Sequence, residues 1–381
     1  MASGNRVSSY GYFAQDVWTV SRNITITYGL RLDHRRPFAP DSGTIVSGPN
    51  TDGVYWIGMK ALPAACNVTN AAPCIPSADG SLAGIDGGVA PIDPTTGKPY
   101  YNAAEPPIQL SPYGTTWGAK GGWGNWGPRF GIAWRIDPKT TLRGGYGIVY
   151  DSTMGMEQDW KGNSGNWPGG GSVVSSIAMN QTGSPLANIE STFGQVGTVL
   201  PAADPWSLGN WFMDPHIKDP RSQQYNLGVE RELGPNTALS MGYVGSLDDR
   251  VGITGLWNTA QTPGTGTAAQ VRARTPFPWY NTSAFYSTSN GTSNYNAFQL
   301  KLDRRFSNGF QYLVSYTWSK AIGEGGSGLF DVENGPGSGG YSIWQNYYNL
   351  KASMGVLAFN IPHFLAIAGQ YAVPVGKDSA T

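Results

Sequence analysis

Hydrophobic and polar residues alternate along several segments of the chain. The alternation is clearest at residues 24–33, where even-numbered positions carry Ile, Tyr or Leu and odd-numbered positions carry Thr, Gly, Arg or Asp. A period of two residues predicts a β-strand with one apolar face and one polar face.

This strand is the second half of a predicted hairpin. Residues 10–18 form the first half, and Ser21-Arg22-Asn23 joins the two. The same unit returns three times, with turns at Asp137-Pro138-Lys139, Gly234-Pro235-Asn236 and Ser307-Asn308-Gly309. A weaker fifth copy bends at Asn360-Ile361-Pro362-His363. The pattern predicts about ten antiparallel strands in five hairpins.

Short and long connections alternate along the chain. Turns of about three or four residues alternate with long connections at 34–126, 151–222, 247–294 and 320–349. All short turns therefore lie at one end of the strands, and all long connections lie at the other. This asymmetry is typical of an antiparallel transmembrane β-barrel in the bacterial outer membrane, with long extracellular loops and lipid around its apolar face.

Aromatic residues near strand ends fit the girdles of such a barrel, although core packing explains them equally well. A soluble β-sandwich or propeller is the alternative, because its strands also alternate. Propeller blades would repeat every 40 to 50 residues. The hairpins here are irregularly spaced, which favours the membrane barrel.

Composition narrows the function. Only 13% of residues are charged, and 25 basic residues balance 25 acidic ones, so the chain lacks the positive field that nucleic acid requires. The three histidines, His34, His216 and His363, lie in no metal-binding or catalytic motif, and no nucleophile elbow or phosphate loop occurs in the right context. We therefore expect no catalytic residues, no metal, no cofactor and no enzymatic activity.

Cys66 and Cys74 are the only cysteines, and no further metal ligand lies near them in a Pro- and Asn-rich segment. We expect a disulfide between them and hence an oxidising compartment. The first residues contain no apolar signal segment. We therefore expect that a leader is missing from this chain.

Tryptophans are frequent in the long connections. Aromatic planes beside Asn, Gln and Ser would suit a sugar or peptide ligand, and packing of the loops on one another is an equal alternative. The candidate ligand-binding residues are Trp117, Trp123, Trp126, Trp160, Trp167, Trp206 and Trp211.

Charged residues on the polar strand faces suit a water-filled lumen, and ladders of opposite charge between neighbouring strands explain them equally well. The predicted inward set is Arg31, Asp33, Arg129, Arg135, Arg143, Glu230, Lys301, Asp303 and Arg305.

The hairpins resemble the barrel of TonB-dependent outer-membrane receptors, especially the Oar-like group that carries a carboxypeptidase-regulatory-like domain. The resembling segments are residues 13–18 (FAQDVW), 28–33 (YGLRLD), 127–134 (GPRFGIAW), 223–231 (QQYNLGVER), 294–300 (NYNAFQL) and 316–320 (YTWSK).

The resemblance implies a barrel of 22 strands around a plug, on which an inner-membrane TonB complex pulls to admit a sizeable substrate. The chain departs from the family in lacking a TonB box, a plug and a terminal aromatic strand. Residues 1–381 are therefore expected to be part of the barrel alone, with a glycan or peptide as the extracellular ligand. The alternative function is a surface carbohydrate-binding protein or adhesin without transport.

Overall fold

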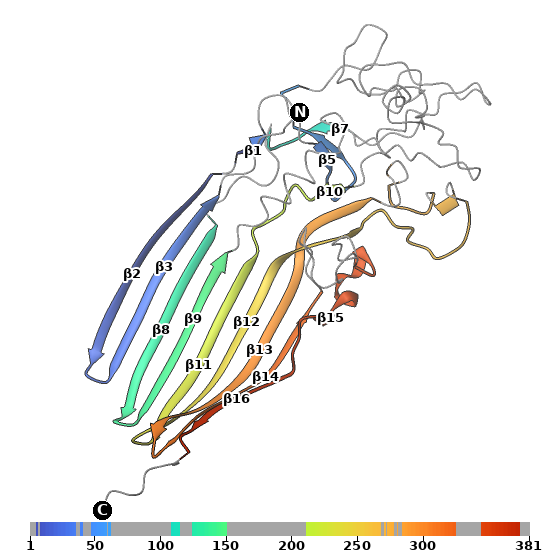
Figure 1. The fold of residues 1–381 in the computed structure, drawn as a ribbon. Helices are drawn as coiled ribbons and strands as arrows, with labels where there is room; N and C mark the ends of the chain where they lie inside the picture. Colours follow the sequence, from blue (N-terminus) through green and yellow to red (C-terminus); the bar gives the residue numbers. More distant parts are fainter. Residues whose placement is uncertain are drawn as a thin grey trace, which may run out of the picture.

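One large antiparallel sheet dominates this computed structural model (Figure 1). The structure describes residues 5–6, 8–35, 39–40, 47–58, 60–61, 108–114, 124–150, 211–267, 270–271, 273–277, 280, 284–324 and 344–373. The nine long strands of the sheet are β2 (Ser9–Ser21), β3 (Ile24–Arg35), β8 (Asn125–Asp137), β9 (Thr140–Tyr150), β11 (Arg221–Gly234), β12 (Thr237–Leu256), β13 (Phe285–Ser307), β14 (Phe310–Gly323) and β16 (His363–Tyr371).

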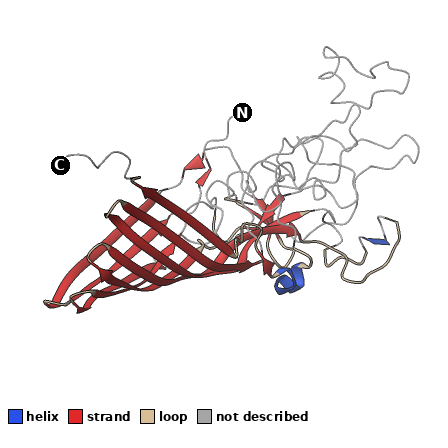
Figure 2. Cartoon of the chain, turned by 60° about the horizontal axis from the view of Figure 1, so that its bottom comes forward, coloured by secondary structure: helices blue, strands red, loops and turns tan. Residues whose placement is uncertain are grey.

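Each long strand pairs with the long strands before and after it in the chain, so the sheet is an unbroken antiparallel meander. The sheet is curved, and its strands are tilted (Figure 2). Within the described residues, the edge strands β2 and β16 do not pair with each other. The all-β antiparallel prediction is confirmed, as an open, partial barrel.

Shorter elements lie at the end of the sheet opposite the tight turns (Figure 1). They include β1 (Asn5–Arg6), β4 (Ala39–Pro40), β5 (Ser47–Pro49), β6 (Tyr55–Ile57), β7 (Ile108–Leu110), β10 (Trp211–Met213) and the 3₁₀ helix η2 (Tyr347–Ser353). Strand β10 pairs in parallel with residues 285–287, at the start of β13. No helix among the described residues is long and apolar enough to cross a membrane.

Four tight turns lie at the predicted positions, between residues 21 and 24, 137 and 140, 234 and 237, and 307 and 310. At the last of these, Asn308 and Gly309 have φ values of 54° and 78°. This left-handed pair is the conformation that a two-residue hairpin turn needs, because its twist matches that of the strands.

The predicted fifth hairpin is wrong. Strand β15 (Gly355–Val356) and β16 both pair with β14, one after the other. Residues 357–362 interrupt this pairing: Ala321 N donates to Asn360 Oδ1 at 2.7 Å, and Ser319 N donates to Pro362 O at 2.9 Å. Pro362 lacks a backbone donor, so the strand deviates locally without turning back.

The predicted connection at 247–294 is also too long. Strands β12 and β13 continue into this segment, up to Leu256 and from Phe285. Their pairing has register shifts around Val251, and Arg250 has a left-handed backbone (φ 58°). Ile253 and Thr254 are both buried although they are adjacent. Hydrophobic and polar residues do not alternate here, because both faces of this part of the hairpin are covered. The two-residue pattern therefore did not predict these parts of the strands.

The pairing register gives the sheet two chemically different faces. Tyr146, Tyr225, Tyr243, Phe298 and Trp318 lie on one face, hereafter the apolar face. Many of its residues are exposed, including Trp318 at 60%. Large exposed apolar residues on a sheet of this length are expected where lipid is the solvent.

Candidate functional site

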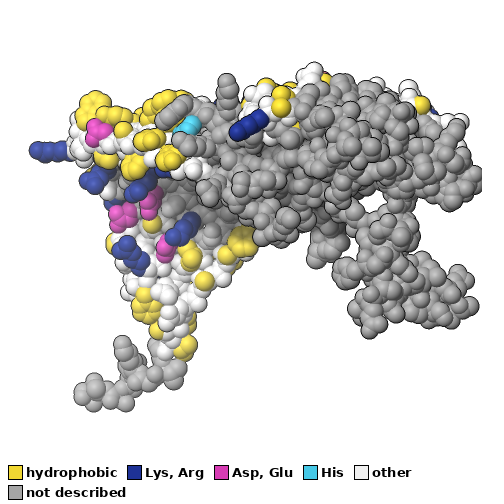
Figure 3. Space-filling model, turned by 90° about the horizontal axis from the view of Figure 1, so that it is seen from above, with side chains coloured by type: hydrophobic (Ala, Val, Ile, Leu, Met, Phe, Trp, Pro, Cys, Tyr) yellow, Lys and Arg dark blue, Asp and Glu magenta, His cyan; other side chains and the backbone are white. Residues whose placement is uncertain are grey.

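The opposite face, hereafter the polar face, collects most of the predicted inward charges. Arg129, Arg143 and Glu230 share it with Arg31 and Asp33, because strand register carries one face across the sheet. Lys301 and Asp303 continue it on β13. Figure 3 shows Lys, Arg, Asp and Glu side chains gathered on the visible part of the sheet, with hydrophobic side chains on either side.

Ion pairs on the polar face run along single strands. The Arg31 guanidinium lies 2.8 Å from the Asp33 carboxylate, two residues further along β3. Lys301 and Asp303 repeat this arrangement on β13 at 3.5 Å. Neighbours two residues apart on a strand share a face, so these pairs follow from the alternation itself. The face therefore has the predicted polar lining, whereas these two ion pairs lie within single strands and do not form the predicted ladders between neighbouring strands.

A hollow of about 470 Å³ lies in the middle of the polar face. Its floor contains Gly228 and Gly242, which are directly opposite each other in register and carry no side chains to fill the space. Arg143, Glu230 and Lys301 are among its walls. The hollow offers charges of both signs, which suits hydrogen bonding to a polar molecule or to another protein segment in the lumen.

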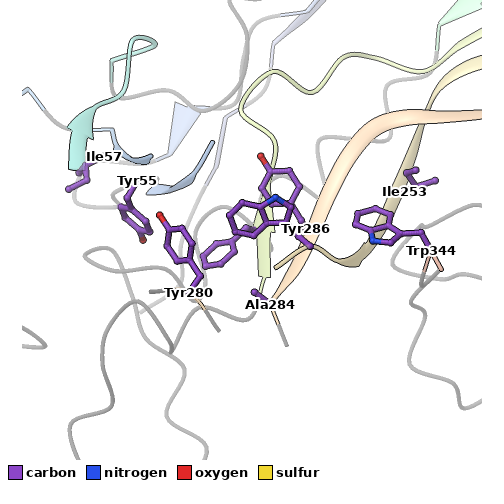
Figure 4. Packing of buried hydrophobic residues seen from close by; sticks show 9 residues of the cluster. Tyr55, Ile57, Ile253, Tyr280, Ala284, Tyr286 and Trp344 are labelled. Carbon is purple, nitrogen blue, oxygen red and sulfur yellow. The ribbon is translucent and has the colours of Figure 1, made fainter. Parts of the chain in front are cut away.

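The long-connection end of the sheet is closed by a cluster of buried aromatic residues, hereafter the aromatic cap (Figure 4). At its centre Trp257 is fully buried, with ring centroids 4.8 Å from Phe277 and 5.0 Å from Tyr286. Both contacts are stacked. The cap contains Tyr55, Ile57, Phe212, Ile253, Trp257, Tyr280, Ala284, Tyr286 and Trp344.

Hydrogen bonds hold the segments of the aromatic cap together. Tyr280 Oη donates to Gly53 O at 3.1 Å, and Trp344 Nε1 donates to Leu256 O at 2.7 Å. The buried Asn258 donates to the carbonyls of Phe277 and Tyr280 and accepts from Phe277 N. Parts of all four long connections thus meet in one packed structure.

A second, smaller cluster lies beside the cap. Trp56, Tyr113 and His216 meet edge to face, with ring centroids 5.6–5.9 Å apart. Asp214 Oδ1 lies 3.3 Å from His216 Nδ1. Burial raises the pKa of Tyr113, and the negative charge of Asp214 raises it further by a smaller amount. His216 therefore takes part in a packed aromatic contact with Trp56 and Tyr113.

The predicted ligand-binding tryptophans are only partly covered by the described residues. Trp126 lies in β8 and not in the preceding connection; it is 48% exposed and pairs with Leu32 on the apolar face. Trp211 begins β10. Trp117, Trp123, Trp160, Trp167, Trp206 and the predicted Cys66–Cys74 pair lie outside the described residues.

Trp257 and Trp344 show what loop tryptophans do where the structure describes them. Both are buried, at 0% and 5% exposure, and both pack on other loop segments. Packing, one of the two alternatives that the sequence left open, therefore holds for this pair. Sequence reasoning missed the aromatic cap as a unit, because its members come from segments far apart in the chain.

The chain is similar to known proteins in its fold and to a known family in its sequence. No curated protein matches the sequence. Among solved structures, the FrpB iron transporter from Neisseria meningitidis is similar at 9% identity, over 83% of this chain and 26% of that one, with a TM-score of 0.34. A mutant of the ferric enterobactin receptor from Pseudomonas aeruginosa is similar at 10% identity, over 83% and 30%, with a TM-score of 0.36. The alcaligin receptor FauA from Bordetella pertussis is similar at 8%, over 84% and 31%, with a TM-score of 0.33.

The chain thus spans less than a third of the length of these structures. The family comparison is far more extensive. A family model described as an outer membrane beta barrel domain matches residues 2–381. The apolar face, the polar face and the tight turns at one end of the meander agree with that match. The chain therefore belongs to the outer membrane β-barrel domain family and resides in the outer membrane.

Proposed function

We propose that this chain is the barrel portion of a TonB-dependent receptor that imports a sizeable substrate across the outer membrane. The observation that carries the proposal is a sheet of nine long strands that curves without closing and presents a charged, hollowed polar face. Barrels of eight strands close and fill their interior with side chains. A sheet that is still open after nine strands belongs to a wider barrel, with room for a channel or a plug.

The aromatic cap supports a receptor over a simple pore. Its buried rings fix the outer ends of several strands and hold together segments from all four long connections. Binding loops need a rigid scaffold of this kind to present a specific surface. We place the substrate class as a glycan or peptide, recognised by aromatic and amide side chains of these connections.

We further propose that the protein belongs to the Oar-like group and that a plug couples its barrel to the TonB complex. The ligand would be contacted by Trp117, Trp123, Trp160, Trp167 and Trp206. The proposal includes no catalytic step. The barrel would bind and release its substrate unchanged, and the energy would come from the inner membrane.

Uptake by whole cells tests this function. Cells that produce the full protein would be given fluorescent oligosaccharides and oligopeptides too large for general porins, with and without a protonophore. We expect intracellular accumulation of one probe class that the protonophore abolishes, because TonB-driven transport depends on the proton gradient. Cells without the protein provide the background.

Two other outcomes would contradict the proposal. Accumulation that persists in the protonophore would indicate a passive pore. Probe that binds but stays on the cell surface, where external washing removes it, would instead favour the carbohydrate-binding or adhesin function. The three mechanisms therefore leave different distributions of the same probes.

A further inference from the structure

A second pocket opens on the apolar face, away from the lumen. It has a volume of about 510 Å³. Tyr243, Phe298 and Trp318 form aromatic walls, and they are direct cross-strand neighbours on β12, β13 and β14. Asn296 and Lys320, also direct neighbours, lie beside them. The pocket thus combines a large apolar surface with polar side chains.

The pocket owes its third side to the interruption between β15 and β16. Asn360 and Pro362 line it from this segment, and Val356 lines it from the end of β15. The segment is held in place, because Ser319 Oγ donates to Ile361 O at 2.8 Å and Ala321 N donates to Asn360 Oδ1 at 2.7 Å. A continuous β16 would run on beside β14 instead, so the interruption that broke the fifth predicted hairpin creates this concavity.

The polar rim of the pocket is preorganised. Asn296 Oδ1 accepts hydrogen bonds from Tyr225 Oη at 2.9 Å and from Tyr243 Oη at 2.6 Å. These bonds orient the amide and leave its Nδ2 donor without a partner among the described residues. Gly245 makes the arrangement possible, since an added Cβ would lie 2.6 Å from the Tyr225 ring. The exposed Lys320 makes no ion pair with any residue that the structure describes.

The position of the pocket along the strands matches a membrane interface. Lys320 lies about eleven residues from the turn at Gly309, which at ~3.3 Å per residue and a tilt of ~45° places it roughly 25 Å from the short-turn side. The apolar band of an outer-membrane barrel is also about 25 Å tall. The pocket therefore lies where acyl chains meet the headgroups of the outer leaflet.

We propose that this pocket binds a phosphorylated glycolipid of the outer leaflet. Acyl chains would pack against Phe298, Trp318 and Val356, and a phosphate would accept hydrogen bonds from Lys320 Nζ and Asn296 Nδ2. Basic residues beside aromatic ones at an interface are a recognised basis for anionic lipid binding. The site faces lipid and is separate from the hollow on the polar face, so the inference stands independently of transport.

Lipid retention by the full chain tests the proposal. The protein and its variants would be reconstituted into phosphatidylcholine nanodiscs with a small fraction of purified lipid A, then extracted in mild detergent. Mass spectrometry would count the lipid A that remains bound. We expect Lys320→Gln to reduce retention about fivefold, the effect of one lysine–headgroup attraction. Lys320→Arg should retain most of it, and Lys351→Gln, at an exposed lysine outside the pocket, should change nothing.

A second variant probes the apolar part. Val356→Trp should fill the pocket and also reduce retention, and this residue is 62% exposed, so the larger side chain has room without disturbing the core. Folding of each variant is checked by the heat-dependent gel mobility of barrels. Unchanged retention in both Lys320→Gln and Val356→Trp would overturn the proposal. Equal losses in Lys351→Gln would show general charge attraction, and disulfide cross-linking between copies of a Val356→Cys variant would show a dimer interface; either also overturns the proposal.

Discussion

Single buried side chains decide how firmly the aromatic cap is held. Trp257 Nε1 has no hydrogen-bond partner in the part of the chain that the structure describes, although the ring is fully buried. An unpaired indole N–H costs free energy, which the two stacked contacts offset. Trp344, by contrast, satisfies its Nε1 on a backbone carbonyl. The Trp257 ring is therefore held by its contacts with neighbouring rings and not by a hydrogen bond from its indole N–H.

Tyr347, which packs against the aromatic cap, makes the stability of the cap depend on pH in the alkaline range. Burial is the largest cause, and the negative charge of Asp214 the second, that raises the pKa of Tyr347 to about 12. The folded state thus holds the phenol proton more tightly than the unfolded state, whose pKa is about 10. This contribution is complete below about pH 10 and is lost as the pH rises toward about 12, at a cost of roughly 2 kcal/mol.

Tyr347→Phe should make this alkaline loss shallower, since it removes the titrating group. Urea unfolding in detergent micelles at about pH 9 and about pH 11.5 would measure the change in free energy of unfolding. Tyr348→Phe is the matched control, because that neighbouring ring is 49% exposed. Identical pH dependence in the wild type and the Tyr347 variant would contradict the expectation.

At the scale of elements, the tight turns set the register of each hairpin. Gly309→Ala places a Cβ on a residue with φ 78°, while the nearest atom would be the Ala372 carbonyl oxygen at an ordinary 3.5 Å. The cost is therefore one of backbone conformation, about 1 kcal/mol in the free energy of unfolding. Urea titration would measure it. Gly234→Ala, beside another turn with open space around it, should be neutral, and equal losses at both sites would count against the turn argument.

The same elements show how far sequence reasoning reaches. Four hairpins were predictable because alternation and turn residues are local signals, and membrane strands must alternate. The extensions of β12 and β13 escaped, since packing on both faces removes the alternation around Ile253. The aromatic cap escaped for another reason: the bond from Tyr280 to Gly53 joins residues 227 positions apart, and no local pattern reports such a contact.

At the scale of the whole molecule, the two faces of the sheet should meet different solvents. Asn226 and Leu227 are adjacent, exposed and on opposite faces of β11. With Cys66 and Cys74 replaced by serine, Asn226→Cys should react with a water-soluble maleimide and Leu227→Cys with a lipid-soluble one. Gel shifts after labelling in intact membranes would report both reactions. The reverse pattern would show that the face assignment is inverted.

The unbroken meander also bears on how such a barrel can change over evolutionary time. Every long strand pairs only with its neighbours in the chain, and every hairpin begins and ends on the same side of the membrane. Duplication or loss of one hairpin would therefore leave both flanking strands with compatible edges and the same inward and outward faces. The circumference could grow or shrink by two strands at a time, so that pore width and cargo size can be altered by recombination without redesigning any surviving strand.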